Sequence, residues 1–271
     1  METLAKTVQE TCNPFERKEL RHAHDCSQDA APPCAVTGEA RVFRCHVSYA
    51  EEADLSPALM VYLRGCNLRC RFCLQALRLA GPDVGMPLHS REVVARIETL
   101  SRGVKWLNWV GGEPSLHAAA IRDLRERLRT PARWLLNTNG IFPAETLALL
   151  DPVMDLYVVD LKFGSETCAR RLAGASRYLP TVQRNLSTIH ATGSHRLLVR
   201  HLLLPGHETC CFEPVARWVA ANLPGVRFHL MDSYVPGPLV MDDPVLGRTV
   251  PVEAVAGARQ RCRQLGLNMT E

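Results

Sequence analysis

The stretch LMVYLRGCNLRCRFC, residues 59–73, joins a short apolar run to a loop that carries three cysteines. The apolar run at 59–63 is typical of a buried β-strand. Cys66, Cys70 and Cys73 follow it in a C-x3-C-x2-C array. Three thiolates can hold three irons of a [4Fe–4S] cluster and leave the fourth iron without a protein ligand. An open metal position is typical of catalytic sites rather than structural ones.

Two other interpretations of the cysteine array stay open, namely a zinc site and three unpaired buried thiols. A zinc site requires a fourth ligand nearby, and none follows in the loop. The nearest downstream histidine, His89, directly precedes an expected helix. We therefore favour the iron–sulfur interpretation.

Five more apolar runs follow the first one along the chain. They cover residues 106–110, 134–136, 156–161, 197–204 and 226–231. Amphipathic helices are expected between them, beginning at Ser90 and Ser115 and covering 144–150, 178–191 and 212–223, with a last helix at 252–265. Strands that alternate with helices predict an α/β fold with a parallel sheet, and right-handed crossovers curl such a sheet. Six units predict a partial (β/α)6 parallel barrel over residues 58–271 that ends with the C-terminal helix.

Residues 1–57 differ from the rest and predict an irregular segment that contains cysteine and histidine. Cys12, Cys26, Cys34 and Cys45 lie in it. Four thiolates suffice for zinc or iron–sulfur, so a second metal site and unligated thiols both stay open. Cys168, Cys210, Cys211 and Cys262 have no ligand-like spacing, and we expect the adjacent Cys210 and Cys211 to be small buried residues.

Composition and charge narrow the classes of partner. The 271 residues are 46% hydrophobic and 22% charged, which is typical of a soluble globular protein. A net charge of +4 does not favour nucleic-acid binding, and no apolar run is long enough for a membrane span. The N-terminus lacks the apolar core of a signal peptide, so we expect a cytoplasmic protein.

Four further motifs follow predicted strands, where the sites of parallel α/β barrels lie. In the first, Gly111 and Gly112 allow a close backbone approach to a ligand, and the Glu113 carboxylate can accept hydrogen bonds from an ammonium group. Asn139 belongs to an NTNG stretch that is either a turn or a wall of the site.

The remaining two motifs place charge in apolar strands. Asp160 and Lys162 are either a buried ion pair or part of the site, because an unpaired Asp within an apolar strand is costly. Arg200 should face a polar partner unless it lies on the outer side of the sheet. His201 should point away from it.

The cysteine array, with Phe72 before its last cysteine, resembles the signature of the radical S-adenosylmethionine (radical SAM) superfamily. The chain resembles in particular an uncharacterised subgroup related to pyruvate formate-lyase activating enzyme, over about residues 59–236. In that superfamily the open iron binds the methionine end of S-adenosylmethionine. One electron then cleaves the sulfonium, and the resulting 5′-deoxyadenosyl radical abstracts hydrogen.

The resemblance also implies roles for individual residues. It implies that Gly111, Gly112 and Glu113 contact the methionine amine, and that Arg200 reaches the carboxylate. Further cofactor contacts are implied for Phe72, Asn139 and Lys162. Tyr234 stands where pyruvate formate-lyase activating enzyme carries a histidine, which makes it a candidate catalytic residue and weakens any claim of an identical substrate.

These features predict a radical SAM enzyme with two cofactors, a [4Fe–4S] cluster and S-adenosylmethionine. The substrate could be a glycyl radical protein, a peptide or a small metabolite, and a non-catalytic iron–sulfur or zinc protein is the alternative. We expect an electron donor such as flavodoxin or ferredoxin as a partner, and neither nucleic acid nor membrane.

Overall fold

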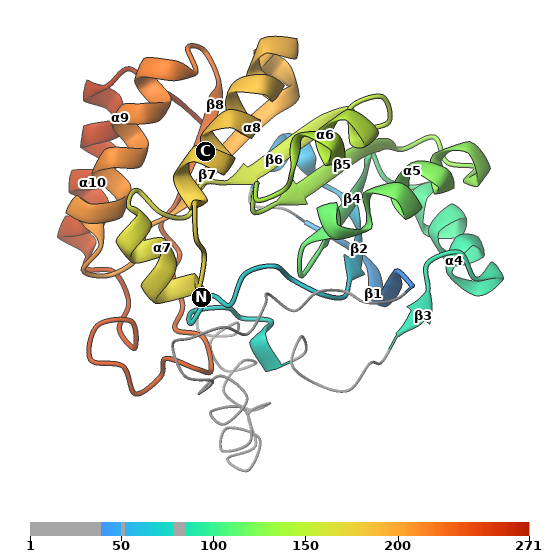
Figure 1. Cartoon of the computed structure of the whole chain (residues 1–271), viewed down its shortest axis with the longest axis horizontal. Coiled ribbons are helices and arrows are strands. Elements are labelled where there is room, and N and C mark those ends of the chain that lie inside the picture. The colour runs from blue at the N-terminus through green and yellow to red at the C-terminus, as the bar shows by residue number, and fades with distance from the viewer. Residues whose placement is uncertain (1–38, 50–51, 78–84, 271) are drawn as a thin grey trace.

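A computed structural model of the chain describes residues 39–49, 52–77 and 85–270 (Figure 1). The predictions for Cys12, Cys26 and Cys34 lie outside these residues. The described strands form one sheet in the order β3-β1-β2-β4-β5-β6-β7-β8-β9. Their bounds are β1 Arg41–Ser48, β2 Ala58–Leu63, β3 Met86–Pro87, β4 Trp106–Gly111, β5 Arg133–Thr138, β6 Leu156–Asp160, β7 Leu197–Leu202, β8 Arg227–Met231 and β9 Asn268–Met269.

Helices connect most of the parallel strands. They are α4 Arg91–Ser101, α5 Ala118–Arg127, α6 Ala144–Leu150, α7 Glu166–Ala173, α8 Tyr178–Thr192, α9 Glu213–Asn222 and α10 Val252–Gln264. The sheet curves, and α4, α5, α6, α8 and α9 lie on its outer side (Figure 1). Strands β2, β4, β5, β6, β7 and β8 pair in parallel and correspond to the six predicted runs. The predicted α/β class with a partial barrel is therefore confirmed.

Three elements differ from the sequence-based expectation. Residues 41–48, which we expected to be irregular, form β1, antiparallel to β2. Helix α7 was not predicted. The helix expected to begin at Ser115 begins at Ala118, after a 3-10 turn over Pro114–His117. The turn forms because the Glu113 carboxylate accepts a hydrogen bond from the backbone N–H of Ser115. The division into segments 1–57 and 58–271 stays a prediction.

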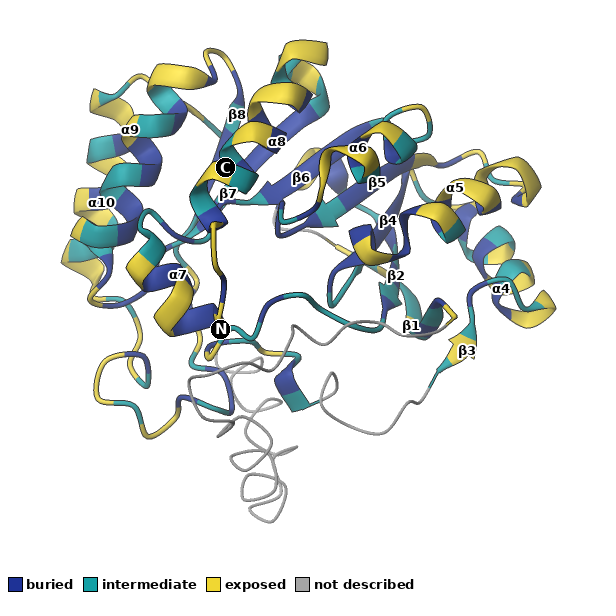
Figure 2. Cartoon of the chain, in the orientation of Figure 1, coloured by how far each residue is buried: buried dark blue, intermediate teal, exposed yellow. Residues whose placement is uncertain are grey.

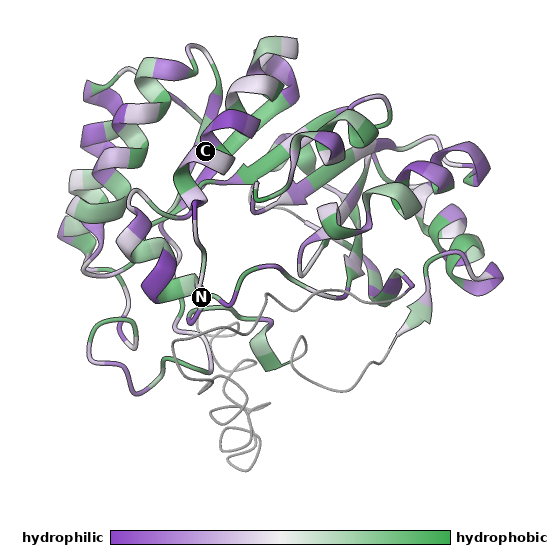
Figure 3. Cartoon of the chain, in the orientation of Figure 1, coloured by the Kyte–Doolittle hydropathy of each residue, from purple (hydrophilic) through white to green (hydrophobic). Residues whose placement is uncertain are grey.

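Alternation along the strands divides the core into two layers. Side chains such as Trp109, Trp134 and Tyr157 face the helices and are fully buried in the larger core. Their strand neighbours face the inside of the curved sheet. The strands and the helix faces that cover them are buried, while the outer faces of the helices are exposed and hydrophilic (Figures 2 and 3).

A small apolar cluster closes one end of the barrel interior. It comprises Leu55, Ala58, Trp106, Leu135, Leu156, Val158 and Leu198, most of which lie near the beginnings of their strands. Two residues further along each strand, the inward positions become polar: Asn137 follows Leu135, Asp160 follows Val158, and Arg200 follows Leu198. The interior therefore has an apolar floor and a polar rim at the carboxyl ends of the strands, where the predicted motifs lie.

Among the residues that the structure describes, no helix combines the length and the apolar character that a membrane span requires.

Candidate functional site

The loop with the three cysteines leaves the carboxyl end of β2 and is held by its neighbours through backbone hydrogen bonds. The N–H of Gly112 donates to the carbonyl oxygen of Leu63 (3.0 Å), and the N–H of Glu113 donates to that of Gly65 (2.7 Å). His117 lies with Nε2 2.7 Å from the Arg64 carbonyl oxygen. The loop is thereby fixed to the end of β4.

Helix α7 holds the other end of this loop. The N–H groups of Arg69 and Arg71 donate to the carbonyl oxygens of Ala173 (2.9 Å) and Leu172 (2.8 Å). These carbonyls belong to the last turn of α7, whose final carbonyl groups have no partner within the helix. The last turn of α7 therefore holds the middle of the cysteine loop in place.

The three predicted cluster ligands carry buried or half-buried thiols. Burial raises the pKa of the Cys70 thiol to about 12, although the nearby Lys162 ammonium acts in the opposite direction. Burial, followed by the charge of Glu113, also raises the pKa of Cys66, and Cys70 and Cys73 contribute to that rise. The three thiols are thus close enough to interact. Three neighbouring thiols, bound as thiolates, are the donor set that a [4Fe–4S] cluster with one open iron requires.

Two glycines allow neighbouring chain segments to approach the cysteine loop closely. A Cβ atom on Gly111 would lie 2.3 Å from the Leu63 carbonyl oxygen. A Cβ atom on Gly237 would lie 2.8 Å from the carbonyl oxygen of Phe72 and 3.1 Å from that of Cys73. The segment after β8 therefore packs directly on the backbone of the cysteine loop.

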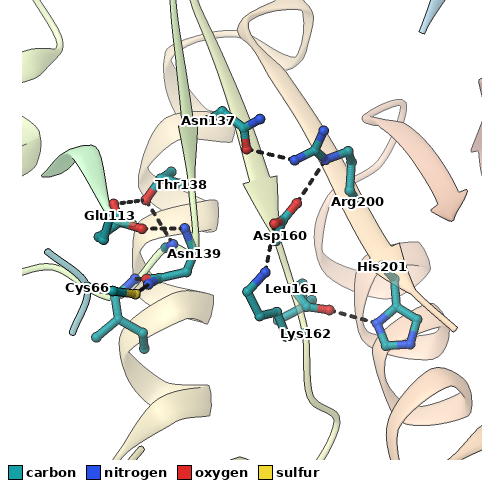
Figure 4. Close-up of polar contacts among 12 residues, drawn as sticks. Cys66, Glu113, Asn137, Thr138, Asn139, Asp160, Leu161, Lys162, Arg200 and His201 are labelled. Carbon is teal, nitrogen blue, oxygen red and sulfur yellow. Dashed lines mark hydrogen bonds and ion pairs between the residues drawn. The ribbon is translucent and has the colours of Figure 1, made fainter. Parts of the chain in front are cut away.

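Glu113 is fully buried and organises the wall beside Cys66 (Figure 4). Its Oε1 accepts from the Thr138 hydroxyl (2.6 Å) and its Oε2 from the Asn139 N–H (2.7 Å). The Asn139 amide in turn donates to Asn67 Oδ1 (2.8 Å) and lies 4.0 Å from the Cys66 Sγ. The GGE and NTNG motifs are therefore one connected network, and Asn139 lies at the cysteine loop.

A row of polar and charged side chains crosses the interior, from Asn137 on β5 through Asp160 and Lys162 at the end of β6 to Arg200 on β7 (Figure 4). Asp160 accepts from Lys162 Nζ (2.7 Å) through one oxygen and from Arg200 Nε (2.8 Å) through the other. A second nitrogen of Arg200 donates to Asn137 Oδ1 (2.7 Å). Arg200 thus faces inward, and the alternative of an outward arginine is wrong.

The charges of this row balance one another. Burial alone would raise the pKa of the Asp160 carboxyl, but the positive charges of Arg200 and Lys162 outweigh burial and hold that pKa well below its usual range. The same carboxylate keeps the pKa of Lys162 raised against the effect of burial. All three groups are therefore ionised at neutral pH, and a ligand with its own charges can exchange partners with them.

Residues 52–54 close the barrel between β2 and β8. Glu52 Oε1 lies 2.7 Å from His229 Nδ1 and 3.9 Å from a nitrogen of Arg200, and Asp54 pairs with Arg227 at 2.6 Å. This segment was expected to be irregular, and it supplies the last carboxylate of the charged row.

His201 points to the opposite side of β7 from Arg200, as predicted. Its Nδ1 lies 2.7 Å from the Leu161 carbonyl oxygen, and its ring packs near Phe212. Burial lowers the pKa of His201 to about 4, so the ring is neutral.

Two predicted residues are engaged in packing. Phe72 is buried with its ring centroid 6.1 Å from that of Phe163. The Tyr234 hydroxyl donates to the Leu246 carbonyl oxygen at 2.7 Å, and burial raises the pKa of Tyr234 to about 12. The cofactor and catalytic roles given to the individual residues above stay predictions.

Asn137 and Thr138 belong to the NTNG stretch for which the sequence left a turn and a wall of the site open, and both take part in the polar network. Sequence reasoning missed Asn67, which follows Cys66 in the chain, and two residues from other segments. No sequence pattern identified Glu52 or His117 as a member of the site, because Glu52 acts through its contact with β8 and His117 through its contact with the cysteine loop.

The comparisons with known proteins agree with this geometry. The family whose sequence profile matches the chain is described as the Radical SAM superfamily, and the match covers residues 60–219. An uncharacterised protein of Methanocaldococcus jannaschii is 27% identical over 227 residues, which covers 81% of this chain. The match spans 66% of that relative's length, slightly less than two thirds.

Two solved structures are also similar. A radical SAM methyltransferase from Sphaerobacter thermophilus has a TM-score of 0.58 at 17% identity, over 97% of this chain and 82% of that one. A domain of pyruvate-formate lyase-activating enzyme from Bacteroides vulgatus has a TM-score of 0.49 at 19% identity, over 60% of this chain and 96% of that one. The first of these likenesses supports the fold.

Proposed function

Because the chain belongs to the radical SAM superfamily, whose members use a [4Fe–4S] cluster and S-adenosylmethionine, we propose that it is an enzyme that cleaves S-adenosylmethionine reductively. We further propose that its substrate is a glycyl radical protein. The observation that carries the cleavage proposal is the position of three half-buried thiols beside a balanced row of charged side chains at the strand ends.

Cys66, Cys70 and Cys73 would hold the cluster. When bound, the cluster supplies the electron that divides S-adenosylmethionine into methionine and a 5′-deoxyadenosyl radical. Under this proposal the hydrogen atom would come from the α-carbon of a glycine, and the products would be 5′-deoxyadenosine and a glycyl radical. A donor protein such as flavodoxin or ferredoxin would supply the electron.

The residues of this chain contribute binding and orientation. S-adenosylmethionine carries a carboxylate and an ammonium group, and these match the charges of Arg200, Lys162 and Asp160. Asp160, Asn137 and Glu52 surround the Arg200 guanidinium, so a ligand carboxylate would bind it in a planar, bidentate way by exchanging with one of these partners. The Glu113 network fixes the backbone of the GGE segment, whose polar groups lie next to the cysteine loop.

The test is an anaerobic cleavage assay. The protein is reconstituted with iron and sulfide, reduced in the presence of S-adenosylmethionine, and assayed for 5′-deoxyadenosine by chromatography. We expect product from the wild type and none from Cys70→Ala. An intact cluster without product would contradict the enzyme and would leave the non-catalytic iron–sulfur protein as the function.

The substrate class needs a second experiment. A candidate glycyl radical protein, such as a pyruvate formate-lyase, is prepared with α-deuterated glycine and incubated in the assay. We expect deuterium in the 5′-deoxyadenosine and a glycyl radical signal by electron paramagnetic resonance. Cleavage that is stimulated by a peptide or small metabolite, with no transfer from the protein, would replace the glycyl radical proposal with modification of that compound.

A further inference from the structure

Four potential metal ligands gather beside the predicted site. Cys168 belongs to α7, while His207, Cys210 and Cys211 belong to the segment that follows β7. The three Sγ atoms and the His207 Nδ1 atom all lie within 4.8 Å of one another. The spacing of these cysteines along the chain gave no sign of a ligand role, and their shared position corrects that expectation.

The distances between these atoms match those of a single tetrahedral ion. Bonds of about 2.3 Å to sulfur and 2.0–2.1 Å to nitrogen place two sulfurs about 3.8 Å apart and a sulfur and a nitrogen about 3.6 Å apart. Cys168 Sγ lies 3.6 Å from both Cys210 Sγ and His207 Nδ1. His207 Nδ1 lies 3.2 Å from Cys210 Sγ and 3.9 Å from Cys211 Sγ.

Two other arrangements of the same thiols are disfavoured by these distances. The 3.6 Å between Cys168 Sγ and Cys210 Sγ is far beyond the length of about 2.05 Å of a disulfide. Two sulfur ligands of one zinc ion can lie no farther apart than the sum of their two bonds to the ion, about 4.6 Å. A cluster of several irons needs a wider set of ligands, so the spacing favours one ion.

The backbone is shaped to bring these ligands together. Residues Glu208–Phe212 form one turn of π-helix, in which the Phe212 N–H donates to the His207 carbonyl oxygen (3.2 Å). Such turns occur frequently at functional sites. A Cβ atom on Gly164 would lie 2.4 Å from the Cys211 carbonyl oxygen, so only glycine allows this approach. The Ser165 hydroxyl caps the N–H of Cys168.

Burial and charge suit a closed structural site. Cys168, His207 and Cys211 are 5%, 4% and 1% exposed, whereas Cys210 is partly exposed and offers a route for an ion. Three thiolates, one neutral imidazole and a divalent ion carry one net negative charge. The positive charge of the Arg171 guanidinium acts on both Cys168 and His207, and it would offset that negative charge.

We propose that Cys168, His207, Cys210 and Cys211 bind one zinc ion that fastens α7 to the segment after β7. Sulfur and imidazole ligands in a tetrahedral array are the set that zinc takes in structural sites. The consequence reaches the predicted active site, because the last turn of α7 accepts the backbone hydrogen bonds of Arg69 and Arg71 in the cysteine loop. The zinc ion would thus stabilise the support of that loop.

The test measures metal content rather than activity. The full chain is purified, and zinc and iron per chain are determined by mass spectrometry of the elements. We expect one zinc per chain in the wild type and in the control Cys262→Ser, whose thiol is fully buried elsewhere. Cys210→Ser, which alters the most exposed ligand, should lose at least nine tenths of the zinc.

A second measurement covers the case in which a variant fails to fold. Cobalt added to the metal-free wild-type protein should give the intense visible absorption of tetrahedral thiolate coordination, and His207→Cys should retain it. Wild-type protein without zinc and without this absorption would overturn the proposal, as would equal zinc in Cys210→Ser and Cys262→Ser.

The outcome is separable from that of the proposed function. Replacing Cys66, Cys70 and Cys73 together by alanine should remove iron and leave the zinc in place. Loss of zinc from that variant, with the fold retained, would assign the zinc to the cysteine loop and contradict the second site.

Discussion

At the scale of single residues, the site depends on two hydrogen-bonded carboxylates, one fully buried (Glu113) and one partly buried (Asp160). Glu113 accepts from Ser115, Thr138 and Asn139, and Asp160 accepts from Lys162 and Arg200. Leaving a buried polar group without its partner costs more free energy than the bond itself contributes. Conservative substitutions at these carboxylates should therefore have large effects.

The substitution Glu113→Gln tests the first network. The side-chain NH2 of glutamine cannot accept a hydrogen bond. It would face an N–H or O–H group that donates to Glu113 in the wild type, and neither of the two facing donors would then have an acceptor. We expect the free energy of unfolding to fall by about 1–3 kcal/mol, measured by urea denaturation of the metal-free protein. The exposed Glu126→Gln should change it by less than about 0.5 kcal/mol. Equal effects of the two changes would show that the Glu113 contacts do not stabilise the fold.

The substitution Asp160→Asn tests the charged row. It leaves the Arg200 and Lys162 charges without the Asp160 carboxylate. Breaking a fully buried pair costs roughly 3–5 kcal/mol, and we expect a smaller loss here because the three side chains are partly exposed. Because the folded-state pKa of Asp160 is lowered, its contribution is present above the unfolded pKa of about 3.9 and is lost as the pH falls further.

The measurement is the free energy of unfolding against pH for the wild type, Asp160→Asn and the exposed control Asp123→Asn. The wild type should lose stability below about pH 4 more steeply than Asp160→Asn. Parallel curves would mean that Asp160 is not held ionised by its partners.

At the scale of elements, three segments converge on the cysteine loop. The end of β4 fixes its beginning, α7 accepts hydrogen bonds from its middle, and the segment after β8 covers its last turn through Gly237. Arg71 also pairs with Asp243 of that segment at 3.1 Å. The loop is therefore positioned by elements that are distant in the sequence.

The substitution Gly237→Ala tests the last of these contacts. The added Cβ would meet backbone oxygens of Phe72 and Cys73, so the covering segment or the cysteine loop must shift. We expect the iron bound after reconstitution to fall at least twofold. Gly257→Ala is the matched control, because nothing lies within 4 Å of its Cβ position in α10.

For Gly257→Ala we expect full iron content and a gain of about 0.5–1 kcal/mol in stability, since alanine is a better helix residue than glycine. Normal iron content in Gly237→Ala would show that the segment after β8 does not shape the loop.

At the scale of the whole molecule, the sequence predicted the barrel because its inner strands are continuous apolar runs separated by amphipathic helices. It placed Arg200 and His201 on opposite sides of β7, which follows from the strand period alone. It did not predict β1, since alternating polar residues in that strand weaken the apolar pattern. The helix after Glu113 begins at Ala118 rather than at the predicted Ser115, because a hydrogen bond to the Glu113 side chain stabilises a 3-10 turn before it.

The pattern of residues within a short stretch of sequence could not predict contacts between segments that are distant in the chain. Glu52 reaches His229 and Arg200 across the barrel opening, and Cys168 meets Cys210 only because α7 and the segment after β7 pack together. The number of residues between the members of such a pair does not indicate that they are in contact. The site formed by Cys66, Cys70 and Cys73 could be predicted from the sequence because the three thiols belong to one loop.

The most direct measurement is the electron paramagnetic resonance spectrum of the reconstituted, reduced protein with and without S-adenosylmethionine. We predict the signal of one reduced [4Fe–4S] cluster, with g values that shift when S-adenosylmethionine is added because the ligand binds the iron that lacks a cysteine. A cluster signal that S-adenosylmethionine leaves unchanged would contradict the open iron position on Cys66, Cys70 and Cys73.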